Sequence, residues 1–338
     1  MNLKFKKPSK ETQLAMSKVA IGEDNQDYHQ LAEEKLANAT GHHYAKLLGS
    51  GNAAILSVMN SIDGAILIPD QGAWNGFKQM AKFLNKDIIT VKTDHGLIDI
   101  DGLDQSISQS SDEGIIDLDD ENKRSALFLT SFAAYTAEQD IEEIGKLLHK
   151  DNILLVEDAS GAIGDSEGKL ANGKYSDIII GSTGSPKIVN VEDGGFITTN
   201  DNSLFDKSNL LLKTNKASNI TACGIYNELD FAEENLKETI DVCLYLKESI
   251  EEKTNFNVFH TDKRGINVIM EAEDSKSLSY KLRQEFVLDR HGMITKCPNY
   301  NRLREKAVAL EIKNLDISCL SDDNLDEMIR ILKKFDKQ

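Results

Sequence analysis

The sequence predicts an α/β fold, with a three-layer α/β/α large domain around a mainly parallel sheet and a small α+β domain after it. Short apolar runs of strand length alternate with helical patterns over about the first 200 residues. Parallel strands need crossover connections, so this alternation is typical of a parallel sheet with helices on both faces. Further on, one long helical pattern and several short elements indicate a second domain.

The first part of the large domain begins with an amphipathic helix over residues 26–39, which Gly41 ends as a helix C-terminal glycine does. The patterns that follow predict a strand at 44–48, a helix at 53–62, a strand at 65–68, a helix at 74–84 and a strand at 88–91. The segment 104–125 is polar and acidic, and we expect an exposed excursion there.

The second part of the large domain continues the alternation. Its patterns predict a strand at 126–130, a helix at 138–149, a strand at 153–157 and a strand at 177–181. Residues 188–200 break this rhythm and predict strand, tight turn and strand, in which Gly194 and Gly195 serve the turn alone.

The change of character near residue 216 divides the chain into two predicted domains. The large domain, with an N-terminal arm, covers residues 1–215, and the small C-terminal domain covers residues 216–338. A long helix over residues 224–253 opens the small domain. A chain of 338 residues with 40% hydrophobic residues is large enough to bury such a pair of cores.

Composition limits the partners that we expect. The chain carries 39 basic and 56 acidic side chains, for a net charge of −17, and an acidic surface repels nucleic acid and anionic membranes. Four widely spaced cysteines without a Cys-x-x-Cys pair indicate neither a metal centre nor a disulfide framework. The N-terminal residues show no signal peptide, and no apolar run is long enough to span a membrane, so we expect a cytoplasmic protein.

Two residues at predicted strand ends, Asp158 and Lys187, fit the requirements of pyridoxal 5'-phosphate. Asp158 follows the apolar strand at 153–157, and Lys187 follows the strand at 177–181 through a short loop. A lysine amine can hold the cofactor aldehyde as a Schiff base, and a carboxylate can keep the pyridine nitrogen protonated, which makes the ring an electron sink. Taken singly, Asp158 also fits a turn cap and Lys187 a solvated surface lysine.

Other candidate cofactor contacts lie at the same expected edge of the sheet. Ser50, Gly51 and Asn52 stand between a strand and a helix N-terminus, where free N–H groups and the helix dipole suit a phosphate. Taken alone, this segment is better explained by plain helix capping by Ser50 or Asn52. Trp74 is placed to stack on a pyridine ring or to anchor a helix. Ser182 is placed to donate to a phosphate or to complete a turn.

The order of these residues resembles the aspartate-aminotransferase superfamily, the type I fold of pyridoxal-phosphate enzymes. The sequence looks closest to the sugar-aminotransferase branch and to uncharacterised archaeal pyridoxal-phosphate-dependent proteins. The matching segments are Ser50 to Ala54 for the phosphate element, Glu157-Asp158-Ala159 for the pyridine-binding aspartate, Ser182 to Lys187 for the Schiff-base lysine, and Asp193-Gly194-Gly195 with the strand after it. Trp74 falls where the family places its ring-stacking aromatic.

The resemblance implies an enzyme that acts on a small-molecule amine, with aminotransferase-like chemistry as the leading reaction. A lyase or a decarboxylase stays open as an alternative, because it would use the same core residues. The alternative from another class is a non-catalytic binding or regulatory descendant of the fold, against which the presence of both Asp158 and Lys187 argues. Type I enzymes build their sites at dimer interfaces, so a homodimer is implied, with Asn219 as a contact that reaches the neighbouring subunit's site.

Two departures from the family limit what the resemblance implies about substrate. Sugar aminotransferases usually carry histidine or glutamine three residues after the aspartate, where this chain has Gly161. Many amino-acid aminotransferases bind the substrate carboxylate with an arginine of the small domain, for which guanidinium geometry is suited. Arg264, Arg290 and Arg302 are candidates here, and no motif selects among them.

Overall fold

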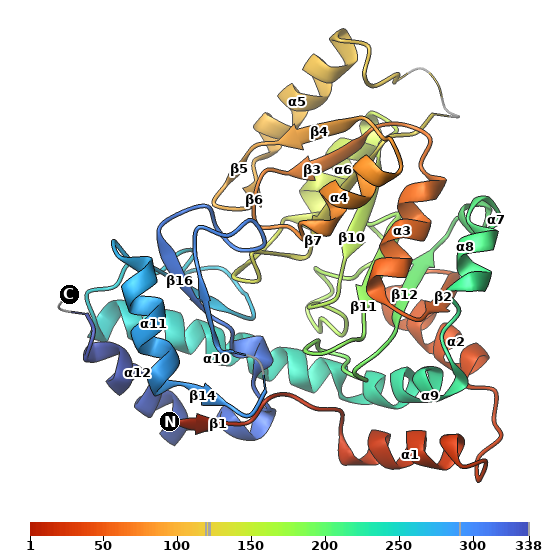
Figure 1. The fold of residues 1–338 in the computed structure, drawn as a ribbon. Helices are drawn as coiled ribbons and strands as arrows, with labels where there is room; N and C mark the ends of the chain where they lie inside the picture. Colours follow the sequence, from red (N-terminus) through yellow and green to blue (C-terminus); the bar gives the residue numbers. More distant parts are fainter. Residues whose placement is uncertain (119, 121–122, 291, 337–338) are drawn as a thin grey trace.

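A seven-stranded sheet forms the centre of the computed structural model, which describes residues 1–118, 120, 123–290 and 292–336 (Figure 1). Its order is β2-β12-β11-β10-β7-β3-β4, and only β12 runs antiparallel to its neighbours. The strands are β2 (Tyr44–Leu48), β12 (Gly195–Thr199), β11 (Ile178–Ser182), β10 (Leu154–Asp158), β7 (Ala126–Thr130), β3 (Ile66–Pro69) and β4 (Ile88–Val91). The predicted mainly parallel sheet is confirmed.

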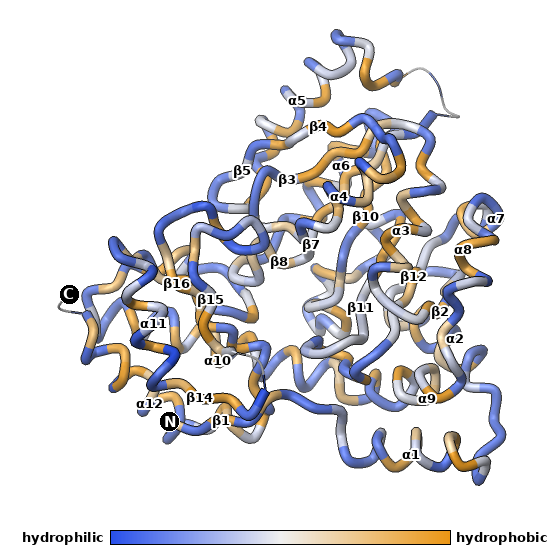
Figure 2. The backbone as a smooth tube through the Cα atoms, in the orientation of Figure 1, coloured by the Kyte–Doolittle hydropathy of each residue, from blue (hydrophilic) through white to orange (hydrophobic). Residues whose placement is uncertain are grey.

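Helices cover both faces of this sheet because its strands bury side chains on both sides. Along β7, Phe128 packs into one apolar core and its neighbour Leu129 into the other. Figure 2 shows β3 and β4 as largely apolar strands. The helices of one face are α2 (Tyr28–Thr40), α5 (Ile100–Asp112), α6 (Ile141–Lys150) and α9 (Asn219–Glu228), and those of the other face are α3 (Gly51–Ser61), α4 (Gly76–Phe83), α7 (Ser203–Lys207) and α8 (Asn209–Thr214).

A small domain with its own apolar core follows. Its antiparallel sheet has the order β13-β16-β15. The elements are α10 (Ala232–Lys253), β13 (Val268–Glu271), α11 (Ser275–Glu285), β15 (Ile294–Lys296), β16 (Ala307–Leu310) and α12 (Asp322–Lys333), with 3-10 turns η2 (Ile312–Asn314) and η3 (Ile317–Cys319). The N-terminal strand β1 (Asn2–Leu3) pairs with β14 (Val287–Leu288) of this domain, and α1 (Lys10–Ala20) then leads to the large domain.

The predicted strands and helices of the large domain are found within a few residues of their predicted bounds, with two exceptions. The first is the segment 104–125, whose first residues belong to helix α5 and not to an irregular excursion. Leu103 and Ile107 of α5 are buried in the core, while the acidic side chains of this helix face outward. Residues 119, 121 and 122 of the expected excursion lie outside the described residues.

The second exception is the predicted hairpin over residues 188–200, which is wrong. Only β12 forms, and its two edges are already paired with β11 and β2, so no edge is left for a second strand from Ile188 to Val191. The pair Gly194-Gly195 has another use than a turn, because a Cβ on Gly195 would lie 2.5 Å from the backbone of Ser50 and Gly51. Glycine here lets β12 pass directly beneath the start of α3.

The long helix predicted over 224–253 is two helices. A 3-10 turn, η1 (Leu229–Phe231), separates α9 from α10. Along α10 the packing changes from the large core, which contains Ile240, to the small core, which contains Val242 (Figure 1). The division of the chain at residue 215 stays a prediction. Among the described residues, no helix is both long and apolar enough to cross a membrane.

A buried lysine of α10 ties the two domains together. Lys247 is fully buried, and its Nζ donates hydrogen bonds to the carbonyl oxygens of Thr136 at 2.6 Å, His260 at 2.8 Å and Lys263 at 2.7 Å. Thr136 belongs to the turn between β8 (Phe132–Ala133) and β9 (Ala137–Glu138) of the large domain. Burial lowers the pKa of Lys247 to about 8.

Replacing Lys247 by methionine is expected to lower the free energy of unfolding by about 3 kcal/mol, because buried carbonyl groups lose their donor. Lys237→Met is the control on the same helix, since Lys237 is exposed and pairs with Asp241 at the surface. Urea unfolding of both variants measures the difference. Equal stability of the two variants would show that the Lys247 hydrogen bonds do not hold the domains together.

Candidate active site

A cavity of about 170 Å³ lies at the carboxyl ends of β10 and β11, beside the N-terminus of α3. Such an edge is where ligands bind in parallel α/β sheets. The lining residues are Gly51, Asn52, Ile55, Trp74, Tyr135, Asp158, Ser160, Ile180, Gly181, Ser182 and Lys187. The structure thus brings together six of the predicted site residues, and Ser50 and Asn219 are not part of this lining.

Asp158 is the last residue of β10 and is buried, with a fixed orientation. Its Oδ1 accepts hydrogen bonds from the Ser160 backbone N–H at 3.0 Å and the Ser160 hydroxyl at 2.5 Å. The Ser160 hydroxyl in turn accepts from the Ser182 backbone N–H at 2.8 Å. These contacts join the ends of β10 and β11 and hold the carboxylate at the cavity.

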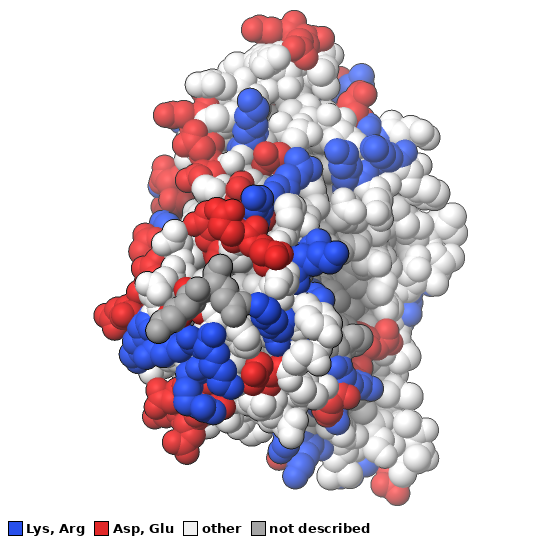
Figure 3. Space-filling model, turned by 60° about the vertical axis from the view of Figure 1, so that its left-hand side comes forward, with Lys and Arg blue, Asp and Glu red and all other residues white. Residues whose placement is uncertain are grey.

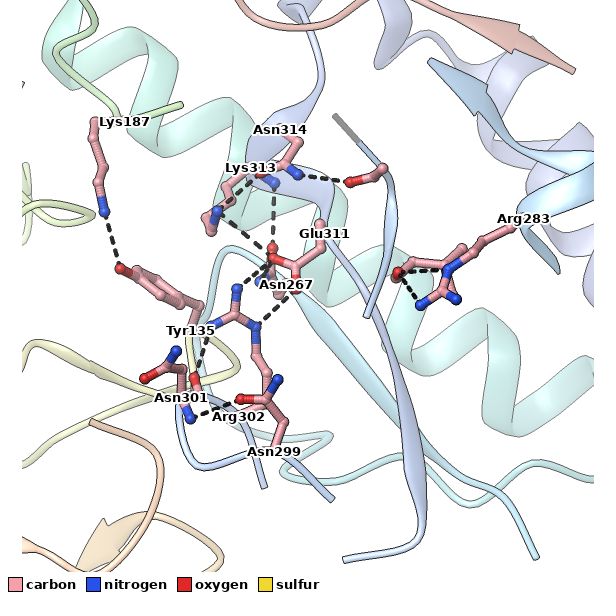
Figure 4. Close-up of polar contacts among 12 residues, drawn as sticks. Tyr135, Lys187, Asn267, Arg283, Asn299, Asn301, Arg302, Glu311, Lys313 and Asn314 are labelled. Atoms are coloured by element: carbon pink, nitrogen blue, oxygen red, sulfur yellow. Dashed lines mark hydrogen bonds and ion pairs between the residues drawn. The ribbon is translucent and has the colours of Figure 1, made fainter. Parts of the chain in front are cut away.

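Lys187 reaches the same cavity from the loop after β11. Its Nζ donates to the phenol oxygen of Tyr135 at 3.1 Å (Figure 4). Burial acts to lower the pKa of Lys187, but the Tyr135 oxygen and the Asp158 carboxylate outweigh it, so that this pKa lies above its usual value. Asp158 and Lys187, which are 29 positions apart in the chain (187 − 158), therefore interact across one cavity.

The N-terminus of α3 forms another wall of the cavity. Gly51 allows this, because a Cβ there would lie 2.5 Å from Cβ of Ser182. The Ser50 hydroxyl caps the helix by accepting from the Ala53 N–H at 3.1 Å, and the Ser182 hydroxyl accepts from the Gly184 N–H at 3.2 Å. Both hydroxyls thus have the local partners expected of a cap and a turn, and their contact with a phosphate stays a prediction.

Trp74 and Asn219 differ in their relation to the cavity. The Trp74 ring lines it and packs edge-on against Phe77, with ring centroids 5.7 Å apart. Asn219 begins α9, where its side chain accepts from the Tyr28 N–H and donates to the Gln26 carbonyl oxygen. Its contact with a neighbouring subunit's site stays a prediction.

The candidate arginines all have carboxylate partners in their own chain. Arg264 pairs with Glu138, Asp165 and Glu167; Arg290 pairs with Glu192; Arg302 makes two 2.8 Å bonds to Glu311. Only Arg302 among them contacts a cavity residue, with its guanidinium 4.9 Å from the centroid of the Tyr135 ring. Each of the three thus already has an ion pair within the chain, and Arg302 is the one that uses two guanidinium nitrogens on a single carboxylate beside the cavity.

Sequence reasoning missed Tyr135 and Ser160. Ser160 stands two residues after Asp158, so an Asx-type turn at a strand end was the available signal. Tyr135 follows the end of β7 by five residues (135 − 130), so it lies at the edge formed by the carboxyl ends of the parallel strands. No residue near it in the sequence links it to Lys187.

Other features of the surface are less suited to catalysis. A larger groove of about 750 Å³ lies between α2, β2 and the α7–α8 segment, and none of the predicted site residues lines it. Among the described residues no group of three His, Cys, Asp or Glu side chains is arranged to hold a metal ion. Acidic and basic side chains are interspersed on the face shown in Figure 3.

The architecture and the position of the cavity define the type I pyridoxal-phosphate fold. Residues 11–222 match the model of the DegT/DnrJ/EryC1/StrS aminotransferase family, and residues 233–333 match the MJ1341 family C-terminal domain. The first match spans more than half of the chain, so the protein belongs to the DegT/DnrJ/EryC1/StrS aminotransferase family. A comparison with curated protein sequences gave no match.

Solved structures support the fold over the full length of the chain. Helicobacter pylori PseC, an aminotransferase involved in the biosynthesis of pseudoaminic acid, has 15% identity and a TM-score of 0.77, with 100% of each chain covered. The putative sugar aminotransferase Spr1654 from Streptococcus pneumoniae, in its PMP-form, has 14% identity and a TM-score of 0.76, with 100% of this chain and 98% of that one covered. A DegT DnrJ EryC1 StrS aminotransferase from Brucella abortus has 14% identity and a TM-score of 0.74, with 97% and 95% covered.

Proposed function

We propose that the protein is a pyridoxal 5'-phosphate-dependent enzyme that acts on a small-molecule amine, with aminotransferase-like chemistry. The observation that carries this proposal is the convergence of Lys187, Asp158 and Trp74 with the N-terminus of α3 on one cavity. The amine suits the cofactor aldehyde, and the carboxylate suits the pyridine nitrogen. The aromatic ring suits the face of the pyridine, and the helix N-terminus suits the phosphate.

The residues present fit this cofactor. Gly51 and Asn52, the first residues of α3, line the cavity together with Ser182, so the helix N-terminus can face a phosphate there. Gly51 makes this close approach possible, because a Cβ there would lie 2.5 Å from Cβ of Ser182. The Ser185 hydroxyl, between Ser182 and Lys187 in the chain, is buried and lacks a hydrogen-bond partner among the described residues. Ser185 does not line the cavity, so its hydroxyl is not counted among the phosphate contacts.

Each residue then has a defined role. Lys187 would hold the cofactor covalently, Asp158 would bind the pyridine nitrogen, and Trp74 would cover the ring face. The predicted phosphate contacts are Ser50, Gly51, Asn52 and Ser182, with Asn219 completing the site of a second subunit in a homodimer. When bound, the cofactor supplies the electron sink that makes a carbon beside the substrate nitrogen acidic.

The protein's own groups would carry the proton. Lys187 Nζ, which lines the cavity, would act as the base when it is not covalently engaged and could return the proton later as an acid. Asp158, whose orientation is fixed by Ser160, would hold its carboxylate toward the pyridine nitrogen. Family membership favours amino transfer, whereas elimination or decarboxylation would employ the same two residues.

The proposal is tested by absorption spectroscopy of the purified protein between about 300 and 500 nm, before and after borohydride, followed by mapping of the labelled peptide. We expect a band that borohydride removes and a covalent label on Lys187. If no band forms even after incubation with pyridoxal phosphate, the chain is a non-catalytic descendant of the fold. Once the band is established, screening of amines for its disappearance identifies the donor.

A further inference from the structure

Tyr135 is held in an unusual backbone conformation at the cavity. It has a φ of 63°, directly after Ala134 with a φ of 53°, in the turn between β8 and β9. Non-glycine residues rarely adopt this left-handed region, and such residues concentrate at functional sites. The Tyr135 carbonyl oxygen accepts from the N–H groups of Ile266 at 2.8 Å and Asn267 at 2.9 Å, and Lys247 holds the next carbonyl.

The small domain surrounds the Tyr135 ring with positive charge. The guanidinium of Arg302 lies 4.9 Å from the ring centroid and the Nζ of Lys313 lies 5.0 Å from it, while the Nζ of Lys187 lies 5.4 Å away (Figure 4). Cations at this range are attracted by the ring. On another side, Gly161 packs against Ile266, whose Cδ1 would lie 2.7 Å from a Cβ at that position, whereas the Tyr135 ring would remain in ordinary contact with it at 3.4 Å.

The two cationic side chains of the small domain, Arg302 and Lys313, are held in place by a buried carboxylate, that of Glu311. Glu311 accepts from Arg302 through both oxygens and from the amide of Asn267 at 2.7 Å, and Lys313 Nζ lies 3.6 Å from it. Glu311 is buried, which opposes its charge, but Arg302 and Lys313 lower its pKa to about 2. Burial lowers the pKa of Lys313 to about 7 against the attraction of Glu311. The positions of these charges around Tyr135 are therefore set by a rigid network.

We infer that Tyr135 is a catalytic residue whose phenol oxygen receives the Lys187 ammonium and stabilises the proton that Lys187 takes from the substrate. This inference rests on the proposed function of Lys187. In the step concerned, a bond between Lys187 Nζ and the proton forms, the substrate C–H bond breaks, and its electron pair stays with the substrate. The resulting ammonium donates its hydrogen bond to Tyr135, so that the phenol makes Lys187 a stronger base.

Among the described residues, ionisable side chains from several elements face Lys187, and some raise its pKa whereas others lower it. Tyr135 from the β8–β9 turn and Asp158 from β10 raise the pKa of Lys187, whereas Arg302, from the loop before β16, lowers it. Lys313 from η2 is also close enough to act on Lys187. Burial and the cations of the small domain lower the pKa of Lys187, and the phenol oxygen of Tyr135 opposes them. Removal of this oxygen should therefore lower the pH at which Lys187 loses its proton.

The test is the pH dependence of Lys187 acetylation by acetic anhydride in the full chain without cofactor, followed by mass spectrometry of the Lys187 peptide. In Tyr135→Phe we expect the midpoint of this profile to move down by about one pH unit. Tyr226→Phe is the matched control, because the Tyr226 ring also carries a lysine ammonium, that of Lys35 at 4.4 Å, yet lies outside the cavity lining. We expect no shift there.

An unchanged midpoint in Tyr135→Phe, or an equal shift in Tyr226→Phe, would overturn the inference. Borohydride labelling with pyridoxal phosphate separates this inference from the proposed function. A Tyr135→Phe protein that still attaches the cofactor at Lys187 without a shifted midpoint refutes the role of Tyr135 alone, whereas a wild-type protein that attaches none refutes the proposed function.

Discussion

Lys187→Ala is expected to abolish covalent attachment of pyridoxal phosphate and to lower amine turnover by about four orders of magnitude, near the upper end of what a proton-transferring group contributes. The fold should persist, since the Lys187 side chain faces a cavity and its hydrogen bond among the described residues is the one to Tyr135. The absorption band, the borohydride label and turnover are the measurements. Lys174→Ala serves as control, because this exposed lysine also lies over a tyrosine ring, that of Tyr175 at 4.8 Å, away from the cavity.

Lys313 is the rival amine for this experiment, and the peptide map distinguishes the two. It is buried close to Tyr135, and a lysine whose pKa is about 7 is partly neutral, and so nucleophilic, at physiological pH. A borohydride label that persists in Lys187→Ala and maps to Lys313 would transfer the covalent role to the small domain. A label that disappears with Lys187 leaves Lys313 as one of the charges behind Tyr135.

The local parts of the site could be predicted from sequence because they depend on strand ends. Asp158 and Ser182 end the neighbouring strands β10 and β11, and Gly51 begins the helix after β2, so their meeting follows once the sheet is parallel. The alternation of strands and helices in the large domain was also predictable, because the spacing of apolar residues differs between a strand and a helix.

The parts that could not be predicted depend on contacts between distant segments. Tyr135 meets Lys187 only because its turn is fixed by residues 266–267 and by Lys247, all of which lie in the second half of the chain. No local pattern reports that Arg302 is already bound to Glu311. The false hairpin has a similar cause: Val189 and Val191 alternate as a strand does, but they pack into the core of the large domain instead of pairing with β12.

The charge of Asp158 can be separated from its position, because asparagine at 158 keeps an oxygen that can accept from Ser160. We expect Asp158→Asn to retain cofactor on Lys187 but to lower turnover by roughly 100- to 1,000-fold, the usual effect of removing one electrostatic contact to the reacting group. The midpoint of Lys187 acetylation should also fall, since the Asp158 carboxylate raises the pKa of Lys187.

Ser160→Ala is the complementary change, since it keeps the charge of Asp158 and removes the hydroxyl that bonds to Oδ1 and to the Ser182 N–H. We expect a smaller loss of turnover, about 10-fold, and little change in Lys187 acetylation. Turnover in Asp158→Asn equal to that of the wild type would remove the carboxylate from the mechanism. Equal losses in Asp158→Asn and Ser160→Ala would instead show that the β10–β11 connection orients the site and that the charge itself contributes nothing further.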